Sequence, residues 1–186
     1  EADAGLSATK QITENRHKTA TAFFPDSGAL ALLQQATAFI WAEADMLDHN
    51  EFQAWLDLWE PDGLYIVPID PKETDHENTL NYAYDDHHMR EKRVRRLGSG
   101  ESISTTPQAR TVRSVSRVRV VGEADGVLTV RAAQDLKEFR KDVLRQHIAD
   151  VTYELRRGEG GGLRLRRKVI RLINSTDTLT SIGYIL

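Results

Sequence analysis

Apolar residues in the first part of the chain recur at helical spacing. From Leu30 to Leu47 they lie three or four positions apart, which predicts a helix with one apolar stripe. A second, shorter helix is predicted from Glu51 to Trp59, with its aromatic residues facing the core. Two short strands, Leu64–Ile69 and Leu80–Tyr84, follow on either side of an acidic loop. The first half of the chain is therefore expected to be rich in helix.

A third helix is predicted directly after the second short strand. Asp85 or Asp86 is suited to cap it, because a carboxylate accepts the free amide hydrogens of a first helical turn. The basic segment from His87 to Leu97 forms the helix itself. Gly98 is suited to the left-handed conformation that often ends a helix.

From Arg110 onward the apolar pattern changes to a period of two residues, which is typical of half-buried strands. Four long strands are predicted, at Arg110–Val121, Val127–Leu136, Phe139–Leu155 and Leu163–Ile173. In the first of them the arginines Arg113, Arg117 and Arg119 are expected on one face, and Val112, Val118 and Val120 on the other. The predicted helices come first in the chain and an antiparallel meander follows them. This order predicts an α+β fold, with the helices on the concave side of a curved, mainly antiparallel sheet.

The composition excludes several classes of chemistry. The chain has 186 residues and no cysteine, so it forms no disulfide and carries neither a thiol nucleophile nor a cysteine-ligated iron–sulfur cluster. We expect an N-terminal arm at residues 1–29 and a single domain at residues 30–186. Since neither a long apolar run nor a signal-peptide pattern is visible, we expect a cytoplasmic protein that does not contact a membrane.

Charge is divided unevenly along the chain. Residues 1–89 carry a net charge of −13 and residues 90–186 a net charge of +10. A basic surface of this size is compatible with binding a polyanion, but no aromatic-plus-basic RNA module is visible. We therefore expect no nucleic-acid partner. The arginines are better explained by neutralisation through the acidic half or through a partner subunit.

The run Asp85-Asp86-His87-His88 contains metal-ligand side chains. Consecutive residues at a helix start point in different directions, so the four side chains do not converge on one ion. Helix capping and a subunit interface explain them better, and we expect no metal site in this chain.

Acid–base catalysis is the alternative function that the residues allow. Asp45, Tyr65, His147 and Asp150 are the candidate groups, and they require a buried carboxylate near a histidine or a tyrosine. Large side chains are expected to fill the interior instead, namely Phe39, Trp55, Trp59 and Phe139. We therefore expect no catalytic residue here, and keep as the alternative a stand-alone isomerase, cyclase or dehydratase that uses Asp45 or Asp150 with His147.

Three blocks of sequence carry a family resemblance. The first comprises Tyr84-Asp85-Asp86, then Arg93, Val94, Arg96 and Leu97, then Pro107, Arg110 and Thr111. The second comprises Glu43–Asp48, Trp55-Leu56, Asp62 and Tyr65–Pro68, and the third is Arg166–Leu172. In this order they resemble the small (β) subunit of aromatic-ring-hydroxylating dioxygenases, over roughly residues 32–186.

The resemblance implies a fold, a role and partners. The fold would be a cystatin-like cone. The chain would be a non-catalytic assembly subunit with no cofactor of its own, self-associated as a trimer that carries three large (α) subunits. Each large subunit would hold a Rieske iron–sulfur cluster and a mononuclear Fe(II), and NADH would supply the electrons that add O2 to an aromatic ring. Six residues are expected to be organising or interface residues, namely Tyr84, Asp85, Arg93, Arg96, Arg110 and Thr111.

Overall fold

The computed structural model of the chain describes residues 26–98, 107–176 and 184–186. The chain divides into two compact units at Gln35, and the sheet belongs to the second, Ala36–Leu186. The expected arm at residues 1–29 lies almost entirely outside the described residues. The helices are α2 (Ser27–Asp48), α3 (Phe52–Asp57) and α4 (His87–Gly98). The strands are β1 (Trp59–Pro68), β2 (Asn81–Asp85), β3 (Arg110–Ala124), β4 (Val127–Arg140), β5 (Val143–Arg157) and β6 (Leu163–Leu172).

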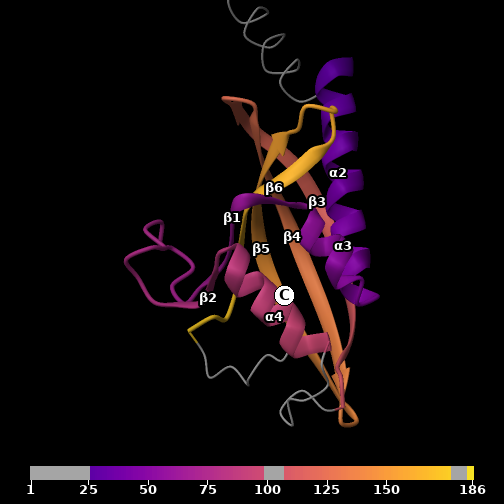
Figure 1. Cartoon of the computed structure of the whole chain (residues 1–186), viewed down its shortest axis with the longest axis vertical. Helices are drawn as coiled ribbons and strands as arrows, with labels where there is room; N and C mark the ends of the chain where they lie inside the picture. Colours follow the sequence, from indigo (N-terminus) through magenta and orange to yellow (C-terminus); the bar gives the residue numbers. More distant parts are fainter. Residues whose placement is uncertain (1–25, 99–106, 177–183) are drawn as a thin grey trace, which may run out of the picture. The chain divides into compact units, whose positions relative to one another are not determined.

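The six strands form one sheet in the order β2-β1-β6-β5-β4-β3 (Figure 1). Strand β1 runs parallel to β6, and every other neighbouring pair is antiparallel. The parallel pair is possible because α4 and four strands, β2 to β5, separate β1 from β6 in the sequence, which leaves ample chain for the crossover. The predicted α+β architecture, with helices on one face of a mainly antiparallel sheet, is confirmed.

The core lies between the inner face of the sheet and the helices. Alternate residues of β4 and β5 are buried, including Leu128, Val130, Val151 and Leu155, as the period of two predicts. On the helical side, Trp55 packs edge-on against Trp59 and Tyr65, with ring centroids 5.5 and 6.2 Å away. Edge-to-face pairs of this kind add to the stabilisation that burial of the rings provides.

The turn between β4 and β5 lies within the strand that the sequence predicted at Phe139–Leu155. Arg140 pairs with Val143, so only Lys141 and Asp142 form the turn, with φ of 51° and 59°. Two residues with positive φ are typical of a type I′ turn, which usually requires Asn or Gly. The prediction was wrong because Lys-Asp is not a recognisable turn sequence of this type.

The side-chain pattern of β3 also differs from the prediction. Arg117 has a positive φ of 53° and the register to β4 shifts between Ser116 and Arg119. This irregularity reverses the alternation, as β-bulges do. Val112 is consequently exposed and Arg113 is buried, so the arginines of β3 do not share one face. Phe139, predicted in the interior, is paired with Arg110 and half-exposed on the outer face.

Helix α4 begins as predicted and ends differently. The Asp86 carboxylate accepts a hydrogen bond from the Met89 amide at 2.8 Å, which makes Asp86 the capping residue. Gly98 is the last helical residue, and its φ is not positive. Trp59, predicted at the end of the second helix, is instead the first residue of β1.

The positive φ of the β4–β5 turn residues gives a testable prediction about stability. We expect Asp142→Gly to raise the free energy of unfolding by about 0.5 kcal/mol, because glycine adopts a positive φ without steric cost and this gain exceeds its entropic penalty. Chemical denaturation measures the change. Gly126, the second residue of the β3–β4 turn with φ of 72°, is the reciprocal control, since Gly126→Asp should destabilise. A destabilised Asp142→Gly variant would contradict the assignment of the turn.

Candidate functional site

A buried ion pair lies at the centre of the interior. Lys168 of β6 donates to both carboxylate oxygens of Glu43 on α2, at 2.8 and 3.0 Å. The indole nitrogen of Trp55 donates to the same carboxylate at 2.9 Å. Both charged side chains are at most 1% exposed. Burial lowers the pKa of Lys168, and the adjacent Glu43 carboxylate opposes that shift.

The last three residues occupy the space that remains beside this pair. The Leu186 amide donates to the Tyr65 hydroxyl at 3.0 Å, and Lys168 donates to the Leu186 carbonyl at 3.5 Å. Arg113 donates to the Ile185 carbonyl. Ile185 and Leu186 are almost fully buried. Three polar side chains of the interior, Tyr65, Arg113 and Lys168, therefore bind the protein's own backbone.

Asp48, at the end of α2, connects that helix to the start of β3. Its carboxylate accepts the Arg113 amide at 2.6 Å and the Thr111 hydroxyl at 2.8 Å, and it also accepts the Arg113 guanidinium. Because Arg113 also reaches Ile185, one arginine holds α2, β3 and the C-terminal residues together. Charge-assisted bonds of this kind are stronger than neutral ones.

Helix α4 is held against β1 and β2 by two arginines. Arg93 forms two bonds with Asp85, at 2.5 and 3.0 Å. Arg90 is fully buried, with its guanidinium 4.2 Å from the centre of the Trp59 ring, and it donates to the carbonyls of Gly63 and Asp85. Burial lowers the pKa of Arg90 to about 10, so it remains charged at neutral pH.

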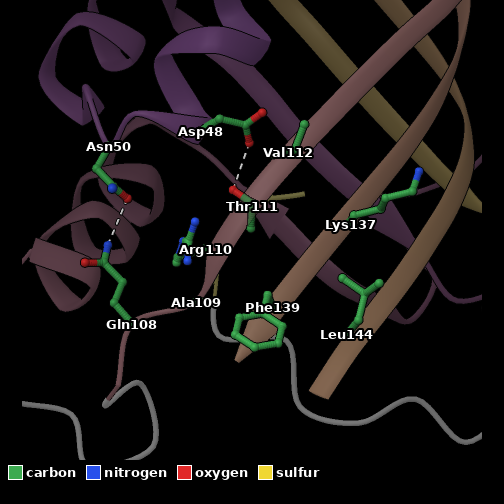
Figure 2. A pocket seen from close by; sticks show the side chains of 10 residues that line it. All are labelled: Asp48, Asn50, Gln108, Ala109, Arg110, Thr111, Val112, Lys137, Phe139 and Leu144. Carbon is green, nitrogen blue, oxygen red and sulfur yellow. Dashed lines mark hydrogen bonds between the residues drawn. The ribbon is translucent and has the colours of Figure 1, made fainter. Parts of the chain in front are cut away.

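A groove opens at the edge of the sheet, at the beginning of β3, between the end of α2 and the outer face of β3, β4 and β5. We call it the β3–β5 groove (Figure 2); its lining residues are Asp48, Asn50, Gln108, Ala109, Arg110, Thr111, Val112, Lys137, Phe139 and Leu144. Its volume is about 630 Å³. Gln108 bonds Asn50 and Thr111 bonds Asp48, which fixes the rim. Val112, Phe139 and Leu144 give it an apolar floor.

Cations surround this groove on the outer face. Arg110 is exposed and makes no ion pair with a residue that the structure describes, whereas Lys137 is paired with Asp135 at 2.7 Å. Farther along, exposed Arg119 and Arg131 are direct partners in the β3–β4 register, and neither has a carboxylate partner in the described part of the chain. Like charges directly opposite each other destabilise a sheet.

The predicted interface residues fall into two groups. Asp85, Arg93 and Thr111 serve contacts within this chain, and Arg93 pairs with Asp85. Arg96 and Arg110 are exposed, and Tyr84 is partly so. Their role toward a partner stays a prediction.

The candidate metal ligands of the run Asp85-Asp86-His87-His88 make separate contacts. Asp85 pairs with Arg93, Asp86 caps α4, and His87 lies 3.4 Å from Glu91. Within residues 26–98, 107–176 and 184–186, no three metal-ligand side chains converge. No helix in these ranges has the length and apolar character needed to cross a bilayer.

The acid–base candidates are not brought together. Asp45 is exposed and pairs with His49, and Asp150 is on the outer face, 3.2 Å from Arg117. His147 and Tyr65 are buried on the inner side. The carboxylates that do reach the interior are Glu43, Asp48 and Glu138, each engaged by a cation or a hydroxyl.

Sequence reasoning missed the interior polar cluster. Glu43 and Asp48 belong to a motif that was noted, but their buried partners Arg113, Tyr153 and Lys168 were not singled out. The register of β6 offered a signal, because Lys168 falls two positions from Ile170 and shares its face. No feature of the sequence indicates that residues 184–186 return to the interior.

Comparison with known proteins agrees with this arrangement. A family described as the ring hydroxylating beta subunit matches residues 42–178, which is most of the chain. The chain belongs to this family.

Individual relatives point the same way. The anthranilate 1,2-dioxygenase small subunit of Acinetobacter baylyi is 28% identical over 78% of this chain and 92% of its own. The biphenyl 2,3-dioxygenase subunit beta of Rhodococcus jostii is 30% identical, over 67% and 78% of the two chains.

A solved structure shares the fold. The beta subunit of the benzoate 1,2-dioxygenase of Burkholderia mallei superposes with a TM-score of 0.65 at 24% identity, covering 81% of this chain and 95% of that one. The expected cone fold is thereby confirmed.

The buried ion pair predicts a specific pattern of stabilities. Lys168→Met should lower the free energy of unfolding by about 3–5 kcal/mol, because it leaves the Glu43 carboxylate buried without its cation. Adding Glu43→Gln, which keeps an acceptor for Trp55, should recover most of that loss. Urea denaturation measures both variants. Equal losses in the single and double variants would show that the two charges are not coupled.

His147 predicts how stability depends on pH. Burial lowers its pKa below the ordinary value of 6.5, so in the window beneath 6.5 the unfolded chain binds a proton that the folded chain does not. Stability should therefore fall as the pH drops from 6.5 toward the folded pKa. His147→Gln should flatten this part of the profile. His76, whose pKa is also lowered by burial, contributes a remaining slope. An unchanged profile would contradict a neutral, buried His147.

Proposed function

We propose that this chain is the non-catalytic assembly subunit of a multicomponent aromatic-ring-hydroxylating dioxygenase. The observation that carries the proposal is the occupied interior: Lys168, Tyr65 and Arg113 bind the backbone of Ile185 and Leu186, where an enzyme with a cone fold would hold a substrate. The small-subunit relatives support it. Exposed arginines such as Arg96 and Arg110 lie on the outside, where they are suitable for binding other subunits.

The finer features of the assembly belong to the same proposal. Three copies form a trimer that carries three large subunits, and each large subunit holds a Rieske cluster and a mononuclear Fe(II). NADH supplies the electrons, in the cytoplasm. The large subunit binds the aromatic substrate and adds O2 to it. The large subunit also determines which aromatic compound is the substrate. Arg96 and Arg110 contribute ion pairs across subunit contacts, for which exposed guanidinium groups are well suited.

The alternative, a stand-alone isomerase, cyclase or dehydratase, lacks a site. Asp150 and His147 lie three positions apart on β5 and therefore on opposite faces of the sheet, and Asp45 is exposed on α2. Neither carboxylate can exchange a proton with His147 without a large rearrangement.

Native purification tests the proposal. We expect the tagged chain to retain a larger polypeptide in equal amount, with the visible absorption of an iron–sulfur protein. A colourless assembly that contains this chain alone would overturn the proposed function.

Two arginine variants test the predicted contacts. Arg96→Ala and Arg110→Ala should each weaken the assembly, so that subunits dissociate at a few-fold lower salt concentration than in the wild type, because a cation at a subunit contact is lost. The iron content per large subunit should not change. Lys92→Ala, on the exposed side of α4, is the matched control. Normal assembly in both variants would remove Arg96 and Arg110 from the interface.

A further inference from the structure

The apolar floor of the β3–β5 groove is exposed. Val112 and Leu144 are 65% and 66% exposed, and Phe139 is 42% exposed beside them. The register places Arg110, Phe139 and Leu144 in one row across three strands, so these side chains share the outer face. An apolar floor bordered by Arg110, which has no ion-pair partner among the described residues, is suited to a segment that carries one apolar side chain and several carboxylates.

The charge at the groove narrows the chemistry of that segment. Arg110 borders the apolar floor and makes no ion pair with a residue that the structure describes. A carboxylate from outside would form a charge-assisted hydrogen bond with its guanidinium. The groove is therefore suited to an acidic protein segment.

The chain itself has such a segment, the β1–β2 loop (residues 69–80). It contains four carboxylates, Asp70, Glu73, Asp75 and Glu77, and one lysine. It ends at Leu80, which is 83% exposed and the most exposed large apolar side chain among the described residues. Charge and apolar character thus match those of the β3–β5 groove.

This loop is ordered by its own hydrogen bonds. Asn78 donates to both oxygens of the Asp75 carboxylate, at 3.0 and 2.9 Å, and Asn81 donates to the carbonyls of His76 and Thr79. A loop that is already ordered loses little conformational entropy on binding. Leu80 is therefore presented to solvent by a fixed scaffold.

We propose that the β1–β2 loop of one copy docks on the β3–β5 groove of a second copy, with Leu80 against Val112, Phe139 and Leu144. Carboxylates of the loop then lie near Arg110. This inference rests on the proposed function, since it assigns the surfaces through which the small subunits meet.

The topology of the sheet makes the contact directional. The loop leads into β2, and the groove is lined by β3, and these are the two edge strands of the sheet (Figure 1). One copy cannot bring its own loop to its own groove while both flank the same six-stranded sheet. Two different surfaces meet at each contact, so the contact is heterologous, and it closes into a ring when each step turns by a third of a circle.

A double-mutant cycle tests the apolar half of the contact. Leu80→Ser and Leu144→Ser should each weaken self-association by about tenfold, and the double variant should be weaker than either single variant by no more than about twofold. The measurement is the dissociation of small subunits, by sedimentation and native mass spectrometry, in the full chain alone and in the co-purified assembly. Both residues are exposed, so folding should be unaffected.

Ile173 provides the matched control. It is 69% exposed at the end of β6, outside both surfaces, so Ile173→Ser should leave self-association unchanged. Fully additive losses for Leu80 and Leu144 would overturn the proposed contact, as would normal self-association in either single variant. A wild-type assembly that contains a single small subunit would also overturn it.

Arg110→Glu separates folding from assembly. Arg110 is exposed and makes no ion pair with a described residue, so the midpoint of urea unfolding should stay nearly the same. In the assembly the substitution places a carboxylate opposite the carboxylates of the β1–β2 loop, so self-association should weaken several-fold. Self-association that is unchanged or stronger would contradict an acidic occupant.

The outcomes also separate this inference from the proposed function. If the Leu80 and Leu144 variants still self-associate but lose the large subunit, the groove binds that subunit and the inference fails while the proposed function stands. If the wild type retains no larger polypeptide, the proposed function fails, and the cycle still decides whether copies of this chain meet through the two surfaces.

Discussion

The Glu43–Lys168 pair is the interaction on which the interior depends. It joins α2 to β6 across the core, and both side chains are removed from water, so neither charge tolerates the loss of the other. The Trp55 indole nitrogen donates a further hydrogen bond to the Glu43 carboxylate. The Lys168 amine lies 5.5 Å from the centre of the Tyr153 ring. Burial of the phenol raises the pKa of Tyr153, which keeps it neutral beside the pair. A polar centre held in this way orients the helix on the sheet.

The same polar centre explains why the interior is a core and not a binding pocket. Tyr65, Arg113 and Lys168 are groups that could bind a ligand in an open cone, but here each contacts the backbone of Ile185 or Leu186. Burial raises the pKa of Tyr65 to about 12, so its hydroxyl remains protonated at neutral pH. In this uncharged state it accepts the hydrogen bond from the Leu186 amide. The protein thus satisfies these three side chains through its own backbone, whereas the Tyr153 hydroxyl, Gln134 Oε1 and His147 Nε2 are buried without a hydrogen-bond partner among the described residues.

Much of the fold was predictable because it depends on local periodicity. The stripe of α2, the cap at Asp86 and the alternation of β4 are properties of neighbouring residues. The hairpin at Lys141–Asp142 was not predictable, because two residues without a glycine signal adopt positive φ under the constraint of the paired strands. The bulge at Arg117 escaped for the same reason, and it exchanged the faces of Val112 and Arg113. The interior cluster joins residues more than a hundred positions apart, so it required the register of the sheet.

The two faces of β3 show how one local irregularity determines both packing and recognition. With unbroken alternation along β3, the faces of Arg113 and Arg119 would be the same. The bulge at Arg117 instead lets Arg113 turn inward to Asp48 and Ile185, and places Arg119 outside opposite Arg131. Inside, the guanidinium of Arg113 binds the Asp48 carboxylate and the Ile185 carbonyl of its own chain. Outside, the repulsion between Arg119 and Arg131 persists in the isolated chain, because no described carboxylate of that chain pairs with either one. A sheet that stabilises its interior while retaining such a cost on its surface is better adapted to an assembly than to an isolated subunit.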